Sequence, residues 1–131
     1  MKNTIFKLTE HVYYFSLLVL LILYLFPGSL IGYLLYGNFG QQPNFISNPI
    51  GTSINHLIFF SYITILAMTV RLRTKNILTN YRFILFISCV LEISHLIIPN
   101  RAFEFYDLIA NFTGVVIILL LNSFIKWRKH L

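Results

Sequence analysis

Residues 92–114 read EISHLIIPNRAFEFYDLIANFTG, and this stretch joins two apolar segments through a short turn containing proline and asparagine. Such a connection predicts that the two segments are helices packed side by side as a hairpin. The stretch also places ionisable and amide side chains where the two segments meet: Glu92, His95, Arg101, Glu104, Asp107 and Asn111. A charged group at the centre of a membrane helix costs about 2.5–3.5 kcal/mol on insertion scales. We therefore expect this cluster to serve a function.

The composition of the whole chain is that of a membrane protein. Of its 131 residues, 57% are hydrophobic and only 11% are charged, whereas a soluble domain has about 25% charged residues. The mean hydropathy is +0.76. Because there is too little polar surface to cover a water-soluble globule, we expect lipid to surround the protein.

Four apolar runs are candidates for transmembrane helices, at residues 12–36, 54–70, 82–98 and 105–125. A helix needs about 20 residues to cross the hydrocarbon core. The third run is short, and we expect it to include Tyr81 and Arg82, with the arginine reaching the interface. Since open strands would leave backbone groups unpaired in lipid, the predicted fold is all-α. It is a single transmembrane domain of four helices over residues 1–131.

Two segments interrupt or separate the first two runs. The Pro-Gly pair at 27–28 predicts a kink near Phe26, because proline removes a backbone hydrogen bond. Residues 37–53 are uncharged and rich in Gly, Pro and Asn, which predicts an extracytoplasmic loop. Its larger apolar side chains could rest on the membrane surface: Phe39, Phe45 and Ile46.

The basic residues are distributed unevenly between the two sides of the predicted bundle. Nine of the ten fall on one side: Lys2, Lys7, Arg71, Arg73, Lys75, Arg82, Lys126, Arg128 and Lys129. Only Arg101 falls on the other, so the positive-inside rule predicts that both termini are cytoplasmic. The net charge of +6 therefore indicates contact with membrane lipids. Nucleic acid is excluded as a partner because no soluble basic face is visible.

The spacing of polar residues predicts that they converge. Glu92 and His95 share a helix face, and Asp107, Asn111 and Gly114 follow i, i+4, i+7 spacing along the next helix. Gly114 has no side chain and allows close approach. The topology thus brings one set of ligand-binding candidates to an extracytoplasmic pocket: His56, Glu92, His95, Arg101, Asp107 and Asn111.

Structural and metal-binding alternatives use the same residues. Arg101 paired with Glu92 or Asp107 could be a clamp that holds the hairpin, and Asn111 could be an interhelical link. The single E-x-x-H pattern, with His56 and Asp107 nearby, could in principle hold zinc. Two histidines, His56 and His95, could likewise hold haem. A di-iron site needs two E-x-x-H helices and two further glutamates, which the chain lacks, and we expect no metal or other cofactor.

The polar positions also resemble a known signature. Glu92-x-x-His95, Pro99-x-Arg101 and Asp107-x-x-x-Asn111-x-x-Gly114 resemble the second signature of VanZ-like membrane proteins, which reads approximately E-x-x-Q, P-x-R, D-x-x-x-N-x-x-G. The first signature of that family, D-K-x-x-H-F, falls on residues 52–57, where only His56 matches. The Asp-Lys pair is Thr52-Ser53 here, and the glutamine is His95, which indicates a divergent member.

The resemblance implies a four-helix fold in the bacterial cytoplasmic membrane and a link to glycopeptide-antibiotic resistance, from which the family takes its name. We expect the pocket to bind an amphipathic envelope ligand, such as a lipid-linked cell-wall intermediate or a lipoglycopeptide, with Arg101 on an anionic group. In an enzyme alternative, Glu92 or His95 would act as general base on a lipid phosphate or ester. A third reading is a small accessory subunit of a larger membrane complex.

Overall fold

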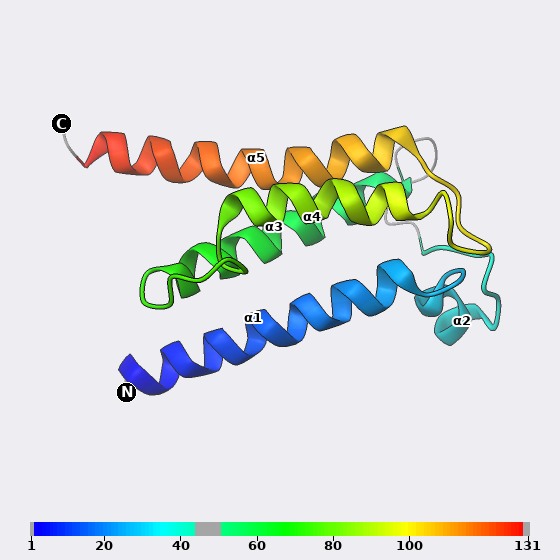
Figure 1. The fold of residues 1–131 in the computed structure, drawn as a ribbon, viewed down its shortest axis with the longest axis horizontal. Coiled ribbons are helices and arrows are strands. Elements are labelled where there is room, and N and C mark those ends of the chain that lie inside the picture. The colour runs from blue at the N-terminus through cyan, green and yellow to red at the C-terminus, as the bar shows by residue number, and fades with distance from the viewer. Residues whose placement is uncertain (1, 44–50, 130–131) are drawn as a thin grey trace.

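The computed structural model describes residues 2–43 and 51–129, and every regular element in these ranges is helical. The five helices are α1 (Lys2–Leu25), α2 (Leu30–Tyr36), α3 (Gly51–Arg71), α4 (Tyr81–Ser94) and α5 (Phe105–Arg128). Four of them lie roughly along one direction, with short α2 at one end and both chain ends at the other (Figure 1). Within the described residues, three helices are long and apolar enough to cross a membrane, namely α1, α3 and α5.

The pattern of the first apolar run predicts one kinked helix, but the structure has two separate helices there. Helix α1 ends at Leu25, eleven residues before the predicted end at residue 36, and α2 begins only at Leu30. Gly28 lies between them with φ of 89°, a left-handed conformation that cannot continue a helix. The side chain of Ser29 then accepts a hydrogen bond from the Gly32 N–H and caps α2. The Pro-Gly pair therefore ends the helix instead of bending it.

The third run is also shorter than predicted. Helix α4 begins at Tyr81, as expected, but ends at Ser94 and not at residue 98. Beyond it the chain tightens, and the N–H groups of Leu96 and Ile97 donate to carbonyls three residues back. Pro99 disfavours helical backbone in the residue before it, which explains why the turn forms here. The second and fourth runs are helical throughout, and α3 and α5 extend slightly beyond them.

Packing inside the bundle is closest where α5 crosses α3, which are the two helices in most extensive contact. A Cβ atom added to Gly114 would lie 2.5 Å from the Leu57 carbonyl oxygen and 3.2 Å from the Cβ atom of Phe60. Ser61 Oγ donates to the Gly114 carbonyl at 3.1 Å. The prediction that Gly114 permits close approach is thus confirmed, and the approaching element is α3. Around this contact lies a core that includes Phe60, Ile63 and Val115.

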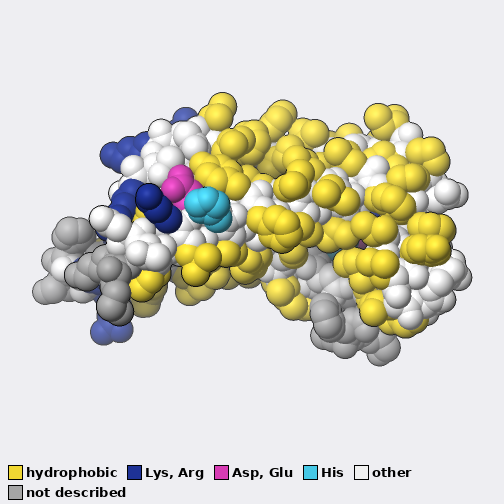
Figure 2. Space-filling model, turned by 90° about the horizontal axis from the view of Figure 1, so that it is seen from below, with side chains coloured by type: hydrophobic (Ala, Val, Ile, Leu, Met, Phe, Trp, Pro, Cys, Tyr) yellow, Lys and Arg dark blue, Asp and Glu magenta, His cyan; other side chains and the backbone are white. Residues whose placement is uncertain are grey.

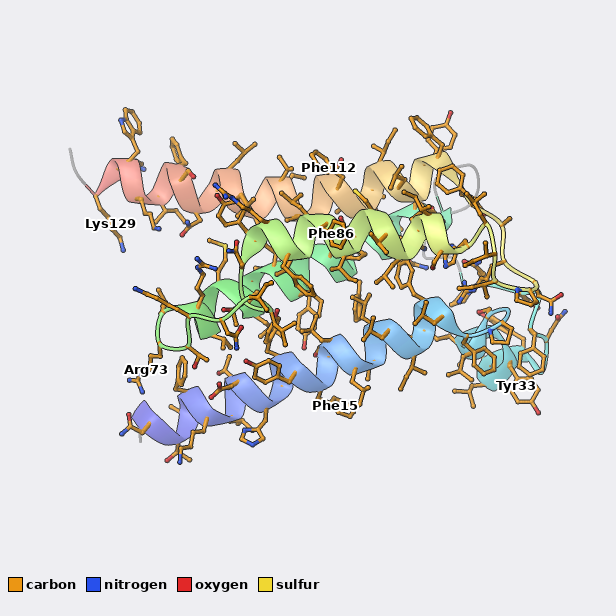
Figure 3. The ribbon with its side chains drawn as sticks, viewed as in Figure 1. Phe15, Tyr33, Arg73, Phe86, Phe112 and Lys129 are labelled. Atoms are coloured by element: carbon orange, nitrogen blue, oxygen red, sulfur yellow. The ribbon has the colours of Figure 1, made fainter. Side chains whose placement is uncertain are left out.

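The outer surface of the bundle is largely apolar. Figure 2 shows hydrophobic side chains over most of one face, with basic side chains gathered at one end. Phe15 and Phe112 point away from the bundle (Figure 3) and are 67% and 48% exposed. In the same view, Arg73 and Lys129 lie at the end that holds the chain ends. This surface fits a protein that lipid surrounds.

The segment after α2 is only partly within the described residues. Gly37 ends α2 with φ of 67°, and Phe39 stacks on Tyr33 with ring centroids 4.1 Å apart. Phe39 is therefore held by α2. Phe45 and Ile46 lie outside the described residues.

Candidate functional site

Polar side chains from four parts of the chain meet at the end of the bundle where α2 lies. This polar cluster consists of Tyr24 from α1, Ser53 and His56 from α3, Glu92 and His95 from α4 and its C-cap, and Asp107 and Asn111 from α5. All seven are buried except His56, whose side chain is 14% exposed. The structure thus brings together five of the six residues predicted from the sequence.

Asn111 and Tyr24 form the centre of the polar cluster. Asn111 Nδ2 donates to the Ser88 carbonyl at 3.2 Å, which fixes the direction of its amide because a carbonyl can only accept. Its Oδ1 accepts from the Tyr24 hydroxyl at 2.8 Å and lies 3.1 Å from His56 Nδ1. Since Oδ1 can only accept, His56 Nδ1 carries a hydrogen. The predicted role of Asn111 as an interhelical link is confirmed, because it joins α1, α3 and α4.

Glu92 and His95 form a pair that must hold a proton. His95 Nε2 lies 3.2 Å from the Tyr24 carbonyl oxygen, so this nitrogen donates. His95 Nδ1 lies 3.2 Å from Glu92 Oε1. If no proton lay between these two atoms, two hydrogen-bond acceptors would face each other. A proton must therefore lie between them. Glu92 Oε1 also accepts from the Glu104 N–H at 3.2 Å. Both ring nitrogens of His95 are therefore engaged inside the protein.

Asp107 is held by α3. Its Oδ1 accepts from Ser53 Oγ at 2.5 Å, and its Oδ2 lies 3.4 Å from His56 Nε2. Ser53 therefore provides a hydroxyl donor to this buried carboxylate. His56 Nδ1 also lies 3.8 Å from Glu92 Oε2. The His56 imidazole consequently stands between the two buried carboxylates.

Arg101 does not form the predicted clamp with a carboxylate. Within the described residues it has no ion pair; instead Nε donates to the Phe26 carbonyl at 3.2 Å and Nη2 donates to the Leu23 carbonyl. In a continuous helix the N–H of residue 27 would bond to Leu23, but proline has none. The N–H of residue 28 would likewise bond to the Tyr24 carbonyl, which His95 now satisfies. Arg101 and His95 thus complete the end of α1.

Two charged groups of the loop lie close to the polar cluster. Burial lowers the pKa of Arg101 from its usual value, although an arginine stays charged in proteins. Burial raises the pKa of Glu104, and the nearby carboxylates of Asp107 and Glu92 raise it further. Glu104 precedes α5 as its N-cap but makes no side-chain capping hydrogen bond.

A cavity of about 140 Å³ lies beside the polar cluster, between α1, α2 and α3. Its apolar wall includes Leu20, Leu23, Leu30, Ile31 and Phe59, and its polar wall includes Tyr24, Asn55, His56, His95 and Arg101. Asn55 Nδ2 donates to the Pro43 carbonyl at 2.7 Å, while its buried Oδ1 has no hydrogen-bond partner among the described residues. The two acidic residues do not line the cavity, and the histidines separate it from them.

The haem alternative does not fit the arrangement of the histidines. The ring of Tyr24 contacts both imidazoles, with its centroid 5.4 Å from that of His56 and 5.4 Å from that of His95. The space that a porphyrin would need is thus occupied by a side chain of α1.

Sequence reasoning missed Tyr24 and Ser53. Tyr24 lies in an uninterrupted apolar run, where the only signal was that a buried tyrosine hydroxyl usually finds a partner. Ser53 was noted only as a departure from a signature. Neither residue has a spacing that points to its partner, because the partners lie in α5, 87 and 54 residues away.

Comparison of the chain with protein-family models, with curated proteins and with solved structures gives no match. The resemblance to VanZ-like proteins therefore remains a prediction from the signature.

Proposed function

We propose that the chain is a VanZ-like protein of the bacterial cytoplasmic membrane that binds an amphipathic envelope ligand in the cavity beside its polar cluster. Its apolar surface, the basic residues at one end and the resemblance in residues 92–114 support this proposal. In this topology both termini are cytoplasmic, and the polar cluster lies at the extracytoplasmic side.

We propose further that α4 is the fourth span. Its 14 residues extend about 21 Å at 1.5 Å per residue, which is short for a bilayer. Its outward face is nevertheless apolar, since Phe86, Val90 and Ile93 are 63%, 39% and 49% exposed. The turn after Ser94 would then complete the crossing.

One observation carries the binding proposal, namely that the cavity has an apolar wall and hydrogen-bonding groups that are still free. Arg101 has five N–H groups, and its recorded hydrogen bonds use only Nε and Nη2. Asn55 Oδ1 offers a buried acceptor in the same cavity. An arginine donor beside an amide acceptor suits a ligand that carries a phosphate and a hydroxyl.

The volume of the cavity limits how much of the ligand can enter. A cavity of about 140 Å³ is smaller than the roughly 300–1,000 Å³ of sites that enclose a drug-sized molecule. It resembles in size the engineered cavity of about 150 Å³ that admits benzene. We therefore propose that only the headgroup or a short chain segment enters and that the rest of the ligand stays in the bilayer.

The enzyme alternative receives less support from this geometry. Glu92 is fully buried, and both ring nitrogens of His95 are engaged within the protein. Glu92 does not line the cavity and His95 has no free ring nitrogen, so neither can take a proton from a molecule in the cavity. The proposed link to glycopeptide resistance depends on the signature alone.

Native mass spectrometry of the purified protein tests the binding proposal, with phosphatidylglycerol and a polyprenyl phosphate as anionic probes and phosphatidylcholine as the neutral one. Leu23→Trp fills the cavity, and Ile22→Trp places the same ring on the exposed face of α1. We expect Leu23→Trp to reduce retention of an anionic probe at least tenfold and Ile22→Trp to leave it unchanged. Equal retention by both variants would contradict the proposal.

A further inference from the structure

We propose that His56, Glu92 and Asp107 bind a divalent first-row transition-metal cation, for which Zn²⁺ is the best match. One ligand atom from each of these residues lies within 4.8 Å of the other two. The three residues come from α3, α4 and α5, so one ion would join three helices. This site shares His56 with the wall of the cavity but stands on different observations from the proposed binding of a lipid.

The first of these observations is an unpartnered oxygen on Glu92. Its Oε1 accepts from the Glu104 N–H and faces His95 Nδ1. Its Oε2 is buried and has no hydrogen-bond partner within the described residues, and it lies 3.8 Å from His56 Nδ1. A buried carboxylate oxygen without a partner carries a large desolvation cost. A cation bound to Oε2 removes that cost.

The second observation is that His56 and Asp107 present acceptors to each other. Because Nδ1 of His56 donates toward Asn111, the neutral imidazole has its lone pair on Nε2. That lone pair lies 3.4 Å from Asp107 Oδ2. Two acceptors at this distance repel, and either a proton on Nε2 or a metal cation between the two atoms removes that repulsion. The same Nδ1 hydrogen bond fixes the ring in the orientation that a metal-bound histidine needs.

The outer hydrogen bonds also fit a metal site. Carboxylates that bind a metal are usually held by hydrogen bonds from surrounding residues. Here Ser53 holds Oδ1 of Asp107, and His95 holds Oε1 of Glu92. Each carboxylate thus has one oxygen fixed by the protein, while the other is the one nearest to His56.

The charges around the site favour a cation, and the types of ligand select which one. At this end of the described chain, Arg101 is the only Lys or Arg, and it binds backbone carbonyls. The proton shared by Glu92 and His95 already balances the charge of Glu92, so a cation bound here balances the charge of Asp107. An imidazole ligand favours Zn²⁺ and its neighbours over Mg²⁺ or Ca²⁺. Three protein ligands leave one position open, as in catalytic zinc sites.

The sequence alone led to the opposite expectation, because E-x-x-H occurs once and the di-iron pattern needs it twice. Spacing along one helix cannot show that His56 and Asp107 come to Glu92 from two other helices. Ligand atoms around one ion about 2 Å away lie at most about 4 Å apart. The cluster would therefore contract slightly when it binds the ion.

Zn²⁺ binding by the purified full chain, prepared in micelles without a polyhistidine tag, tests the proposal. We expect one Zn²⁺ per chain after dialysis, and at least tenfold weaker binding in Asp107→Asn and in His56→Phe. The matched control is Glu10→Gln with His11→Ala, which removes a carboxylate and an imidazole from α1 at the opposite end of the bundle and should retain binding. Absence of Zn²⁺ from the wild-type protein, or full binding by both site variants, would overturn the proposal.

X-ray absorption at the zinc edge of the wild-type protein keeps the test decisive if the site variants fail to fold. We expect a first shell of one imidazole nitrogen and oxygen donors. A shell with several imidazoles, or with oxygen alone, would overturn the assignment.

Discussion

The end of the bundle near α2 buries two carboxylates and an amide, whereas no charged side chain is buried among the described residues at the end that holds the chain ends. Glu92 and Asn111 are 0% exposed. Asn111 is bound by groups from α1 and α4, and Glu92 by His95 at the end of its own helix and by the Glu104 N–H before α5. By contrast, Lys75, Lys126 and Arg128 are exposed to the surroundings. A buried polar group must find its partners inside the protein. The first end is therefore organised as a site, while the second has the solvated charges of a membrane surface.

The basic end also has a hollow, of about 750 Å³, between α3, α4 and α5. Arg71, Lys75 and Lys126 contribute to its lining, and no carboxylate does. Basic pockets between transmembrane helices suit anionic lipid headgroups. The hollow is larger than the cavity near α2, but none of the charged residues in its lining is buried. Size therefore does not distinguish the site, and the buried polar cluster does.

The largest expected difference between the two ends is in stability. Glu92→Ala removes the partner of His95 and of the Glu104 N–H, and breaking a buried pair costs about 3–5 kcal/mol. Lys126→Ala changes an exposed residue and should stay within about 0.5 kcal/mol. Unfolding in micelles with EDTA present, to exclude metal, measures both. Similar losses in the two variants would refute the contrast.

Arg101→Ala should cost less, because it unpairs two carbonyls at the end of α1. An unsatisfied buried acceptor costs about 1–3 kcal/mol. Pro27→Ala returns the N–H that can bond to the Leu23 carbonyl, so Arg101→Ala should cost less in that background. The unfolding free energies of the two single variants and the double variant measure this coupling. An unchanged cost in the Pro27→Ala background would show that Arg101 does not replace the missing bond.

This coupling also changes how the accessory-subunit reading can be tested. Loss of abundance in an Arg101 variant no longer points to a missing partner, because Arg101 supports the end of α1 within the chain itself. The same holds for Asn55, whose Nδ2 donates to the Pro43 carbonyl, so co-purification of a second protein with the wild-type chain is the better test of this alternative.

Gly114→Ala should destabilise the bundle by about 1–3 kcal/mol, the usual cost of overpacking. The added methyl group would lie 2.5 Å from the Leu57 carbonyl oxygen, so α3 and α5 must move apart. The control is Gly40→Ala, where the nearest atom, Asn38 Oδ1, is 3.4 Å away. Thermal unfolding in micelles distinguishes them, and equal stability would mean that the helices do not cross at Gly114.

The smallest expected effect is that of Glu104→Gln. Burial and two nearby carboxylates raise the pKa of Glu104, so the folded state favours its protonated form. The wild type therefore loses stability as pH rises through that pKa, and the variant does not. We expect Glu104→Gln to be more stable at pH 7 by less than about 0.5 kcal/mol, because solvent screens this group. The advantage should vanish below about pH 4, and a variant less stable at pH 7 would contradict this.

The sequence predicted some parts of this fold better than others. The apolar runs that became α3 and α5 were identifiable because their composition directly reflects the surrounding lipid. The end of α1 was not, because the carbonyls left free by Pro27 are satisfied by Arg101 and His95, far along the chain. Helix-face spacing brought Glu92 next to His95, but it could not reveal Tyr24, whose partners lie on other helices.

The central claim is that side chains from different spans meet in one buried polar cluster. A double-mutant cycle between Tyr24 in α1 and Asn111 in α5 tests it most directly, with Tyr24→Phe and Asn111→Leu each removing one side of a hydrogen bond of 2.8 Å. Residues in contact show interaction energies of about 0.5–3 kcal/mol, whereas distant residues give additive effects. We predict a coupling in that range between these two positions. Strict additivity of the two substitutions would contradict the account.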